Sequence, residues 1–289
     1  MKEHFWYDEV FKDLSRLGLK ATDKLFDERS ELQHVEIIDT IPYGRVLAID
    51  ETFMTSEKDE HFYHEMLVHP ALTTAPQLKR VLVIGGGDGG TVREVLTYPE
   101  VEQVVMVEID RLVVEACRRF LPSIGRAWDD PRLQVLIADG IKFVKKRDIE
   151  PFNVILLDGC DPIGPAKGLF TLDFYRNCAA LLADDGVFAL QTESPILQRT
   201  TFLDIGQALS QVFKKVHPYF GPAPIYPSGT WSWIYATQSI DHFSPRPDRA
   251  MRQEERCKYY NRDIHRAAFA LPNDLKKIFQ DGAVKIPED

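Results

Sequence analysis

The chain has 289 residues, 44% of them hydrophobic, and its 44 acidic side chains outnumber its 35 lysines and arginines, which gives a net charge of −9. A chain of this size and composition can bury a full core as one large domain, or as one domain with a small extension. The negative charge disfavours nucleic acids and acidic membranes as partners, because phosphate binding needs concentrated lysine and arginine. It suits a cationic small molecule better.

The sequence also bears on location and on metal content. No apolar run approaches the roughly 20 residues that cross a bilayer, and the N-terminus "MKEHFWYDEV" lacks the regions of a signal peptide, so we expect a cytoplasmic protein. The four cysteines are scattered without a C-x-x-C pair, which predicts neither a disulfide framework nor a zinc site. His61, His64 and His69 lie near Glu65 without an assembled zinc pattern, and we predict no metal.

The predicted elements fall into two parts. Residues 33–55 hold short apolar and β-branched runs separated by "PYG" and "DET", which is typical of a small antiparallel sheet. We interpret the charged stretch "KDLSRLGLK" before them as a solvated helix face. We therefore assign residues 1–57 to an N-terminal β-strand domain and residues 58–289 to a larger α/β domain with a C-terminal extension. The larger domain opens on helical spacing over residues 57–75.

Strands and helices then alternate. The strands "RVLVIG", "QVVMVEID", "LQVLIAD" and "FNVILLDG" are nearly continuous apolar runs, separated by the helical stretches "TVREVLTY", "RLVVEACRRFL" and "IKFVKKR". This alternation predicts a parallel sheet covered by helices on both faces. A further strand, "VFALQ", and a helix over residues 200–214 follow. We expect "KVHPYFG" and "SWIYATQ" to form an antiparallel C-terminal hairpin, with a last helix near "NDLKKIF".

Acidic residues follow the predicted parallel strands. In a parallel sheet, ligands bind outside the carboxyl ends of the strands, where the strand-end residues meet. Five carboxylates are therefore predicted to converge on one crevice: Asp88, Glu108, Asp139, Asp158 and Asp161.

The turn after the first parallel strand reads "GGGDGG". Gly85, Gly87 and Gly90 match the pattern G-x-G-x-x-G. Glu108 falls where an acidic residue would bind ribose hydroxyls, but this match fits a nicotinamide dehydrogenase and a nucleoside-binding transferase equally. Asp88 separates the two, because a carboxylate at this turn repels a pyrophosphate and attracts an ammonium or a sulfonium. The alternative is that Asp88 only caps the following helix.

Four ordered motifs carry a resemblance to a known family. They are "EKDEHFYHEM", "VLVIGGGDGGTVREVLTYPEVEQVVMVEID", "LDGCDPIGPAKGLFTLDFY" and "YPSGTWSW". Together they resemble the aminopropyltransferases of polyamine biosynthesis, the spermidine synthase family, and the tail "CKYYNRDIHRAAFALP" is similar to that of the bacterial members. The resemblance implies a class I methyltransferase-like Rossmann fold, a homodimer or homotetramer assembled through the N-terminal β region, and no metal. It also implies transfer of an aminopropyl group from decarboxylated S-adenosylmethionine to putrescine, which gives spermidine and methylthioadenosine.

The resemblance further implies the residues of the site. Those on the side of the nucleoside co-substrate are Gln33, His64, Gly85, Gly87, Asp88, Glu108, Ile109, Asp139, Gly140 and Pro165. Those on the acceptor side are Tyr63, Asp88, Asp158, Asp161, Gln191, Tyr226 and Trp231. Asp158 is the expected base, with Tyr63 and Tyr226 beside it. Asp88 would bind the aminopropyl amine, and Asp161 would anchor the far ammonium of a diamine.

Some features leave alternatives open. Trp231 and Trp233 share one strand face, where they either line the acceptor pocket or pack in the core. The stretch "GCDPIGPAKG" is interpreted as a lid or as an ordinary surface loop. Gly159 and Met54 depart from the family pattern, so cadaverine, agmatine or a longer polyamine are alternative acceptors. A methyltransferase using S-adenosylmethionine and a non-catalytic nucleoside or polyamine binder are the competing functions.

Overall fold

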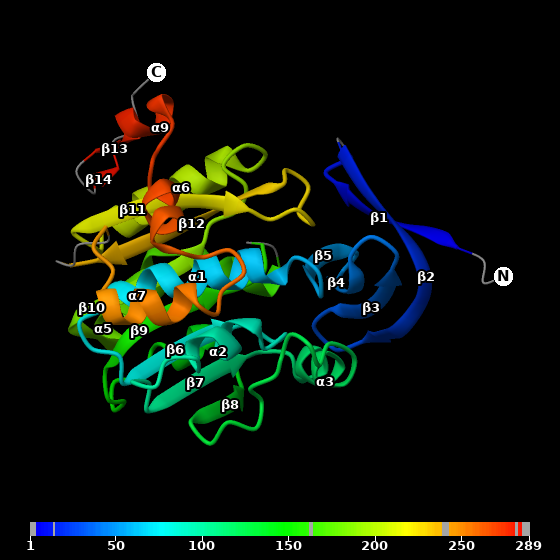
Figure 1. The fold of residues 1–289 in the computed structure, drawn as a ribbon, viewed down its shortest axis with the longest axis horizontal. Helices are drawn as coiled ribbons and strands as arrows, with labels where there is room; N and C mark the ends of the chain where they lie inside the picture. Colours follow the sequence, from blue (N-terminus) through cyan, green and yellow to red (C-terminus); the bar gives the residue numbers. More distant parts are fainter. Residues whose placement is uncertain (1–3, 14, 162–163, 239–242, 281–282, 285–289) are drawn as a thin grey trace.

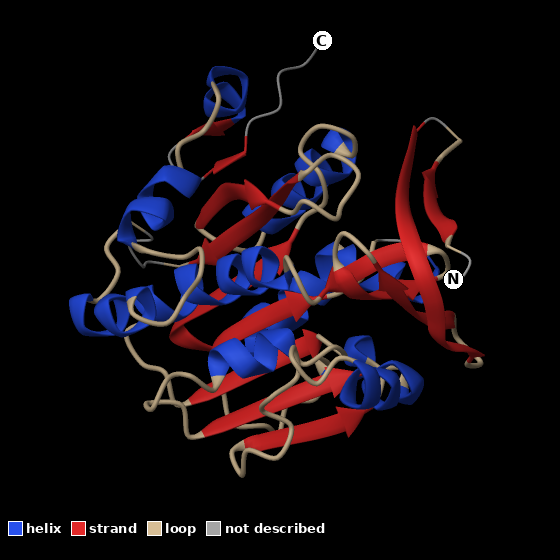
Figure 2. Cartoon of the chain, turned by 45° about the vertical axis from the view of Figure 1, so that its right-hand side comes forward, coloured by secondary structure: helices blue, strands red, loops and turns tan. Residues whose placement is uncertain are grey.

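The computed structural model describes residues 4–13, 15–161, 164–238, 243–280 and 283–284. An N-terminal antiparallel sheet stands beside a larger, mostly parallel sheet with helices on both faces (Figures 1 and 2). The small sheet contains, in spatial order, β1 (Phe5–Phe11), β2 (Ser15–Arg29), β3 (His34–Thr40), β4 (Gly44–Ile49) and β5 (Thr52–Ser56). The prediction of a helix face at "KDLSRLGLK" is wrong, because its described residues belong to the hairpin of β1 and β2 or to the turn between them.

The large sheet has the order β11-β12-β10-β9-β6-β7-β8. Its parallel strands are β6 (Arg80–Gly85), β7 (Gln103–Glu108), β8 (Leu133–Ile137), β9 (Phe152–Asp158) and β10 (Leu182–Gln191). Strand β12 (Thr230–Thr237) pairs antiparallel with β10 and with β11 (Lys215–Pro222). The predicted fold class is confirmed, including the antiparallel C-terminal hairpin.

Helices cover both faces of this sheet (Figure 2). In chain order they are α1 (Glu60–Thr74), α2 (Gly90–Val95), α3 (Arg111–Phe120), α4 (Gly140–Phe143), the 3-10 helix η1 (Gly164–Phe170), α5 (Leu172–Leu181), α6 (Arg199–Ser210), α7 (Pro247–Glu254), α8 (Arg262–Ala268) and α9 (Asn273–Ile278). A short pair of strands follows, β13 (Phe279–Gln280) and β14 (Ala283–Val284). Helix α4 is much shorter than the predicted stretch "IKFVKKR", because the chain turns after Phe143. Within the described ranges, no helix combines the length and the apolar character that crossing a membrane requires.

The core divides at the sheet because side chains along a strand point alternately to its two faces. On β6, Val81 and Val83 pack in the cluster that contains α1 and α2. Leu82 and Ile84 pack on the opposite face, in the cluster that contains α5 and α6. Both faces of β6 are therefore buried, which explains its continuous apolar sequence.

The C-terminal segment is fixed to α1 by buried polar groups. The carboxylate of Glu65 accepts hydrogen bonds from the backbone N–H groups of Lys258, Tyr259 and Tyr260, at 2.8–2.9 Å. The guanidinium of Arg249 donates to the backbone carbonyls of Leu72 and Ala75 near the end of α1. These contacts hold α1 between the C-terminal helices and the sheet, so its N-terminal half is presented to the edge where the parallel strands end.

Strands β6 and β9 mark the switch point of the sheet. The chain runs from β6 outward to β7 and β8, and then returns to the other side of β6 as β9. Gly85 is paired with Asp158 at the carboxyl ends of these strands. Ligands of open α/β sheets bind at such a switch point, so the fold places the end of β6 and Asp158 where a ligand is expected.

Gly85 gives a test of this junction. Its φ is +83°, and a Cβ added there would lie 2.0 Å from the backbone carbonyl oxygen of Asp158. Gly85→Ala should lower the free energy of unfolding by more than about 3 kcal/mol, through left-handed backbone strain and collision with β9. Chemical denaturation measures the change.

Gly229→Ala is the matched control, because Gly229 also has a positive φ, of +65°, but open space where a Cβ would lie. Backbone strain alone should cost about 1 to 2 kcal/mol there. Equal losses for the two variants would contradict the collision at Gly85.

Candidate active site

Three adjoining cavities lie at the carboxyl edge of the large sheet. The large cavity, of about 300 Å³, is lined by Gln33, Gly85, Glu108, Ile109, Asp139, Gly140, Asp158 and other residues. The small cavity, of about 40 Å³, lies toward β1 and is lined by residues that include Glu9, Tyr63, Asp161, Gln191, Tyr226 and Trp231. The connecting cavity, of about 100 Å³, includes Tyr63, His64, Gly87, Asp88, Asp158 and Tyr226. The sequence-predicted site residues thus come together, apart from Pro165, whose side chain lies outside the described part.

Asp158 ends β9 and lines both the large and the connecting cavities. The hydroxyl of Tyr63 donates to its Oδ1 atom at 2.9 Å, and the hydroxyl of Thr91 donates to its Oδ2 atom at 2.7 Å. Burial and the nearby charge of Asp88 raise the pKa of Asp158, while the charge of His64 and the two hydroxyl donors lower it. Asp158 is therefore a half-buried carboxylate whose basicity is increased and whose orientation is fixed.

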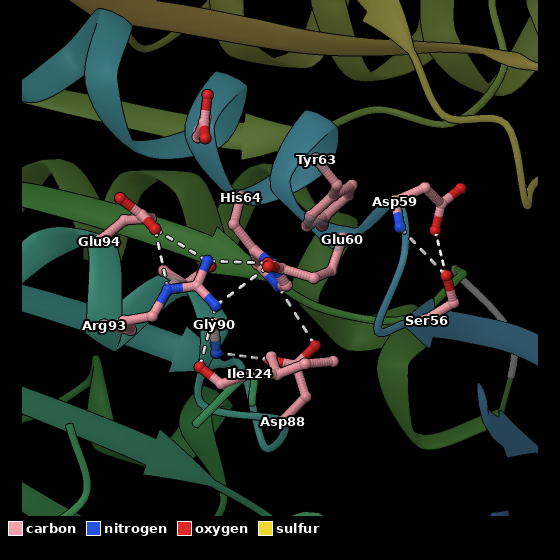
Figure 3. Close-up of polar contacts among 12 residues, drawn as sticks. Ser56, Asp59, Glu60, Tyr63, His64, Asp88, Gly90, Arg93, Glu94 and Ile124 are labelled. Atoms are coloured by element: carbon pink, nitrogen blue, oxygen red, sulfur yellow. Dashed lines mark hydrogen bonds and ion pairs between the residues drawn. The ribbon is translucent and has the colours of Figure 1, made fainter. Parts of the chain in front are cut away.

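Asp88 lies in the glycine-rich turn before α2, and Figure 3 shows it facing His64. Its Oδ1 atom accepts the backbone N–H of Gly90 at 2.8 Å, and its Oδ2 atom lies 3.2 Å from Nε2 of His64. Burial opposes the charged form, but the charge and hydrogen bond of His64 outweigh it and hold the pKa of Asp88 below its usual range. Asp88 therefore accepts a hydrogen bond from the start of α2 and also presents a half-buried negative charge to the connecting cavity.

His64 is held from two sides. Its Nδ1 atom lies 2.7 Å from Oε2 of Glu60, one helical turn earlier on α1, and its Nε2 atom faces Asp88. Burial favours the neutral ring, but Asp88 and Glu60 together raise the pKa of His64 well above its usual value. The ring is therefore an imidazolium with both nitrogens protonated.

Arg93 continues this arrangement (Figure 3). Its guanidinium contacts both carboxylate oxygens of Glu60, at 2.8 and 3.1 Å, and also Glu94 at 2.8 Å. It donates as well to the carbonyl of Ile124 at 2.9 Å. Charges thus alternate in sign from Asp88 through His64 and Glu60 to Arg93, which balances the buried acids.

Several groups of side chains place possible metal-ligand atoms close together. His64, Asp88 and Asp158 place ligand atoms within 4.8 Å of one another. A metal ligand must offer an unprotonated ring nitrogen, whereas Asp88 and Glu60 raise the pKa of His64 and favour its doubly protonated ring. In the groups of His69 with Glu94 and Cys257 and of Asp27 with His34 and Glu36, histidine nitrogens also lie against carboxylates.

Two further acids line the large cavity. Glu108 ends β7, and its Oε1 atom accepts the backbone N–H of Asp110 at 2.9 Å. Burial raises the pKa of Glu108 to about 7, although backbone hydrogen bonds partly oppose this. Asp139 caps α4 by accepting the backbone N–H groups of Ile141 and Lys142 through one oxygen. Its other oxygen lies 3.5 Å from the Lys142 ammonium.

The small cavity contains more carboxylates than were predicted. Glu9 of β1 lines it, accepts the backbone N–H of Phe53 at 2.9 Å, and has a pKa raised by burial to about 7. Glu193 lies behind the cavity wall, 1% exposed, with a backbone φ of +70°. Gln198 donates hydrogen bonds to both Glu193 and Asp161. Burial raises the pKa values of Asp161 and Glu193, which favours their protonated forms unless a cation lies beside them.

Aromatic side chains form the wall between the small and connecting cavities. The ring of Tyr226 packs against Trp231, at 4.5 Å between centroids, and against Tyr63 at 6.0 Å. Its hydroxyl donates to the backbone carbonyl of Met54 at 2.8 Å and is therefore directed toward β5. Trp231 lines the small cavity, whereas Trp233 is fully buried in the core behind Tyr63. Both tryptophans pack in the core cluster, and only Trp231 also lines the small cavity.

The predicted lid lies only partly within the described residues. Residues 162–163 fall outside them, and η1 begins at Gly164. Gly164, Ala166 and Leu169 line the large cavity, so this segment forms one of its walls.

Sequence reasoning missed several residues in and around the site: Glu9, Glu60, Thr91, Arg93, Glu193 and Gln198. The spacing of Glu60 and His64, one turn apart on a helix, is a signal that could have found Glu60. Glu9 reaches the site only through the docking of β1, so no local pattern indicates it.

Comparison with known proteins agrees with this geometry. Residues 60–244 match the spermine/spermidine synthase domain, and residues 5–57 match the spermidine synthase tetramerisation domain. The chain belongs to the spermidine synthase family. A polyamine aminopropyltransferase from Thermoanaerobacter sp. (strain X514) is 42% identical over 286 residues, covering 96% of this chain and 99% of that protein.

Solved structures of the spermidine synthase family show the same fold. A crystal structure of a spermidine synthase in complex with the transition state analogue AdoDATO has a TM-score of 0.91 and 39% identity. The match covers 95% of this chain and 94% of the chain in that crystal structure. The spermidine synthase from Thermotoga maritima has a TM-score of 0.90, with the same identity and coverage. The family predicted from the sequence motifs is confirmed.

The charge on His64 gives a prediction that needs no substrate. Because its folded-state pKa is raised, the protonated ring stabilises the fold fully below the unfolded-state pKa of about 6.5, and this stabilisation is lost as the pH rises through the folded-state pKa. Glu60→Gln should lower the pKa of His64, since it removes one of the two facing carboxylates. Nitrogen NMR of the imidazole ring measures it.

Glu115→Gln is the control, because Glu115 is exposed on α3. It should leave the titration of His64 unchanged. A wild-type His64 that loses its proton near pH 6.5, the ordinary value, would contradict the assigned charge.

Proposed function

We propose that the protein transfers the aminopropyl group of decarboxylated S-adenosylmethionine to putrescine, giving spermidine and methylthioadenosine. The observation that carries the proposal is Asp88, a carboxylate only 12% exposed in the glycine-rich turn, where a phosphate ligand would require positive charge. The proposed donor is a dication with a sulfonium and a terminal ammonium. S-adenosylmethionine would instead bring a carboxylate toward Asp88, which disfavours the methyltransferase alternative.

The large and connecting cavities are the proposed site of the donor. Glu108 would bind the ribose hydroxyls, and Asp139 with Gly140 would bind the adenine. Gln33, Gly85, Ile109 and Pro165 would enclose the nucleoside, and His64, Gly87 and Asp88 would receive the aminopropyl chain. The size of the large cavity supports this assignment, since it holds about 300 Å³ and lies against the end of β7.

The small cavity is the proposed site of the acceptor. One amine would lie at Asp158, beside Tyr63 and Tyr226, and the chain would extend past Gln191 and Trp231. The far ammonium would lie near Asp161. The carboxyl groups of Glu9 and Glu193 support this polarity, because an ammonium bound beside them would favour their charged forms, which burial otherwise disfavours.

The proposed reaction is an in-line displacement at the carbon attached to sulfur. A bond forms between the amine nitrogen and this carbon, and the carbon–sulfur bond breaks with its electron pair leaving on sulfur, as the neutral thioether of methylthioadenosine. The proton of the amine passes to Asp158. A sulfonium is already a good leaving group, so catalysis consists mainly of positioning and of supplying a neutral amine.

Deprotonating the acceptor is the main obstacle. An amine with a pKa near 10.4 costs roughly 4 to 5 kcal/mol to deprotonate at neutral pH. The neighbouring sulfonium lowers the amine pKa by like-charge repulsion, and burial acts in the same direction. Asp158 can then accept the proton as the new bond forms, and the raised pKa of its carboxyl improves it as a base.

The identity of the acceptor depends on the small cavity. Met54 lines all three cavities, and Gly159 lies beside Asp158 without a side chain. Both positions depart from the pattern of the family. Cadaverine, agmatine and a longer polyamine are therefore the other acceptors to test.

We also propose a homodimer or homotetramer that uses the N-terminal sheet. On β1, Tyr7 and Glu9 point inward, whereas Trp6 and Val10 are 65% and 55% exposed. This alternation leaves an apolar outer face available to another subunit. The proposed domain boundary remains at residues 57 and 58, between β5 and α1. We propose a cytoplasmic location, in keeping with four cysteines that are free thiols.

The first test is release of methylthioadenosine from decarboxylated S-adenosylmethionine, with putrescine, cadaverine, agmatine or spermidine supplied separately. We expect release with putrescine and loss of release in Asp158→Asn, because the base is removed. S-adenosylmethionine is the control donor. Turnover of that control to S-adenosylhomocysteine, without methylthioadenosine release from any pair, would reject the proposal.

A substitution at Glu9 tests whether the far ammonium of the acceptor lies at the β1 end of the small cavity. Glu9→Gln should raise the KM for putrescine roughly tenfold or more, because a hydrogen bond to a charged group is lost, and should leave the KM for the donor unchanged. Steady-state kinetics measures both constants. Glu28→Gln, an exposed position on β2, is the control. A change confined to the donor KM would place the far ammonium elsewhere.

A further inference from the structure

A threonine just after the glycine-rich turn contacts the proposed base. Thr91 is the second residue of α2, and its side chain is fully buried. Its hydroxyl donates to Oδ2 of Asp158 at 2.7 Å. Because α2 follows directly on the turn, this hydrogen bond joins the segment that carries Asp88 to the end of β9.

The hydroxyl has little value for packing. Other buried residues of α2, Val92 and Val95, lie in the apolar core. A valine has the same shape as a threonine, and burying a hydroxyl is unfavourable unless it is hydrogen-bonded. The benefit of a threonine at this position therefore lies in its contact with Asp158.

Building on the proposed function, we propose that Thr91 is a positioning residue for Asp158. Tyr63 holds the Oδ1 atom from α1, and Thr91 holds the Oδ2 atom from α2. A carboxylate has about four acceptor sites, so two donors fix its plane and leave positions open for an incoming amine. Thr91 thereby keeps the base in one orientation beside the turn that receives the donor.

The contact also acts on the charge of Asp158. Burial and Asp88 oppose ionisation, whereas the Thr91 hydroxyl stabilises the charged form. Removing this hydroxyl leaves Oδ2 with one donor fewer in a buried site and should raise the pKa of Asp158 further. The titratable and charged groups that face Asp158 are Tyr63 and His64 from α1, Asp88 from the turn, Glu108 from β7, Cys160 after β9, and Tyr226 between β11 and β12. None of them is altered by a substitution at Thr91.

Thr91→Val removes the hydroxyl and keeps the shape of the side chain. We expect kcat with the proposed donor and putrescine to fall roughly tenfold, and the acid limb of the kcat/KM profile to move upward by about one pH unit. The KM for the donor should stay unchanged. Thr91→Ser retains the hydroxyl and should restore most of the activity and the wild-type pH profile.

Thr237→Val is the matched control, because Thr237 is a fully buried threonine on β12 whose hydroxyl donates to the carbonyl of Gly186. It should lower the melting temperature and leave the pH profile unchanged. A wild-type profile for Thr91→Val, or equal losses in Thr91→Val and Thr91→Ser, would overturn the role of Thr91. Equal losses would assign the effect to packing.

A second measurement does not need turnover. Infrared difference spectra recorded at several pH values detect the protonated carboxyl of Asp158. Its band is identified as the one that is missing in Asp158→Asn. This band should appear at higher pH in Thr91→Val than in the wild type, and an unchanged onset would overturn the inference. If the wild-type protein is inactive with every donor and acceptor, the proposed function fails. The infrared titration still shows whether the hydroxyl of Thr91 lowers the pKa of Asp158.

Discussion

Buried negative charge at the ends of β6 and β9 is the constraint on which the rest of the site depends. Asp88 and Asp158 line the same cavity, and each carboxylate opposes the ionisation of the other. Isolated buried charges are costly, so the fold must supply partners for them. Asp88 has the imidazolium of His64, whereas Asp158 has two neutral hydroxyl donors. Because the partners differ, the pKa of Asp88 is lowered and that of Asp158 stays raised.

Helix α1 is the element that arranges these partners. Glu60, Tyr63 and His64 are spaced so that they lie on one side of the helix, toward the turn before α2 (Figure 3). The same helix is held at its other end by Arg249, and by the backbone of the C-terminal segment at Glu65. A rigid α1 fixes the positions of the tyrosine and the imidazolium together. The C-terminal helices therefore support the site without contributing to its cavities.

Much of the larger domain could be predicted because its signals are local. Continuous apolar strands indicated a parallel sheet, and the carboxyl ends of such strands must meet at one edge, which brought Asp88 and Asp158 together. The first two strands could not be predicted in this way. The long β2 mixes exposed and buried residues with register shifts, so its alternation is interrupted. Glu9 was missed for the same reason, since its place in the site depends on where that sheet docks.

The two ends of the site differ in how they are built. Asp88 and Glu108 themselves follow strands of the large sheet, although Gln33, Ile49 and Met54 of the N-terminal part line the same cavities. The small cavity lies between the two sheets, where β1 supplies Glu9 and the carbonyl of Met54 accepts the hydroxyl of Tyr226. The docking of the N-terminal sheet therefore sets the width of this end. Small changes at this junction can therefore alter the proposed acceptor end, and Met54 and Gly159, which line the small cavity, depart from the pattern of the family.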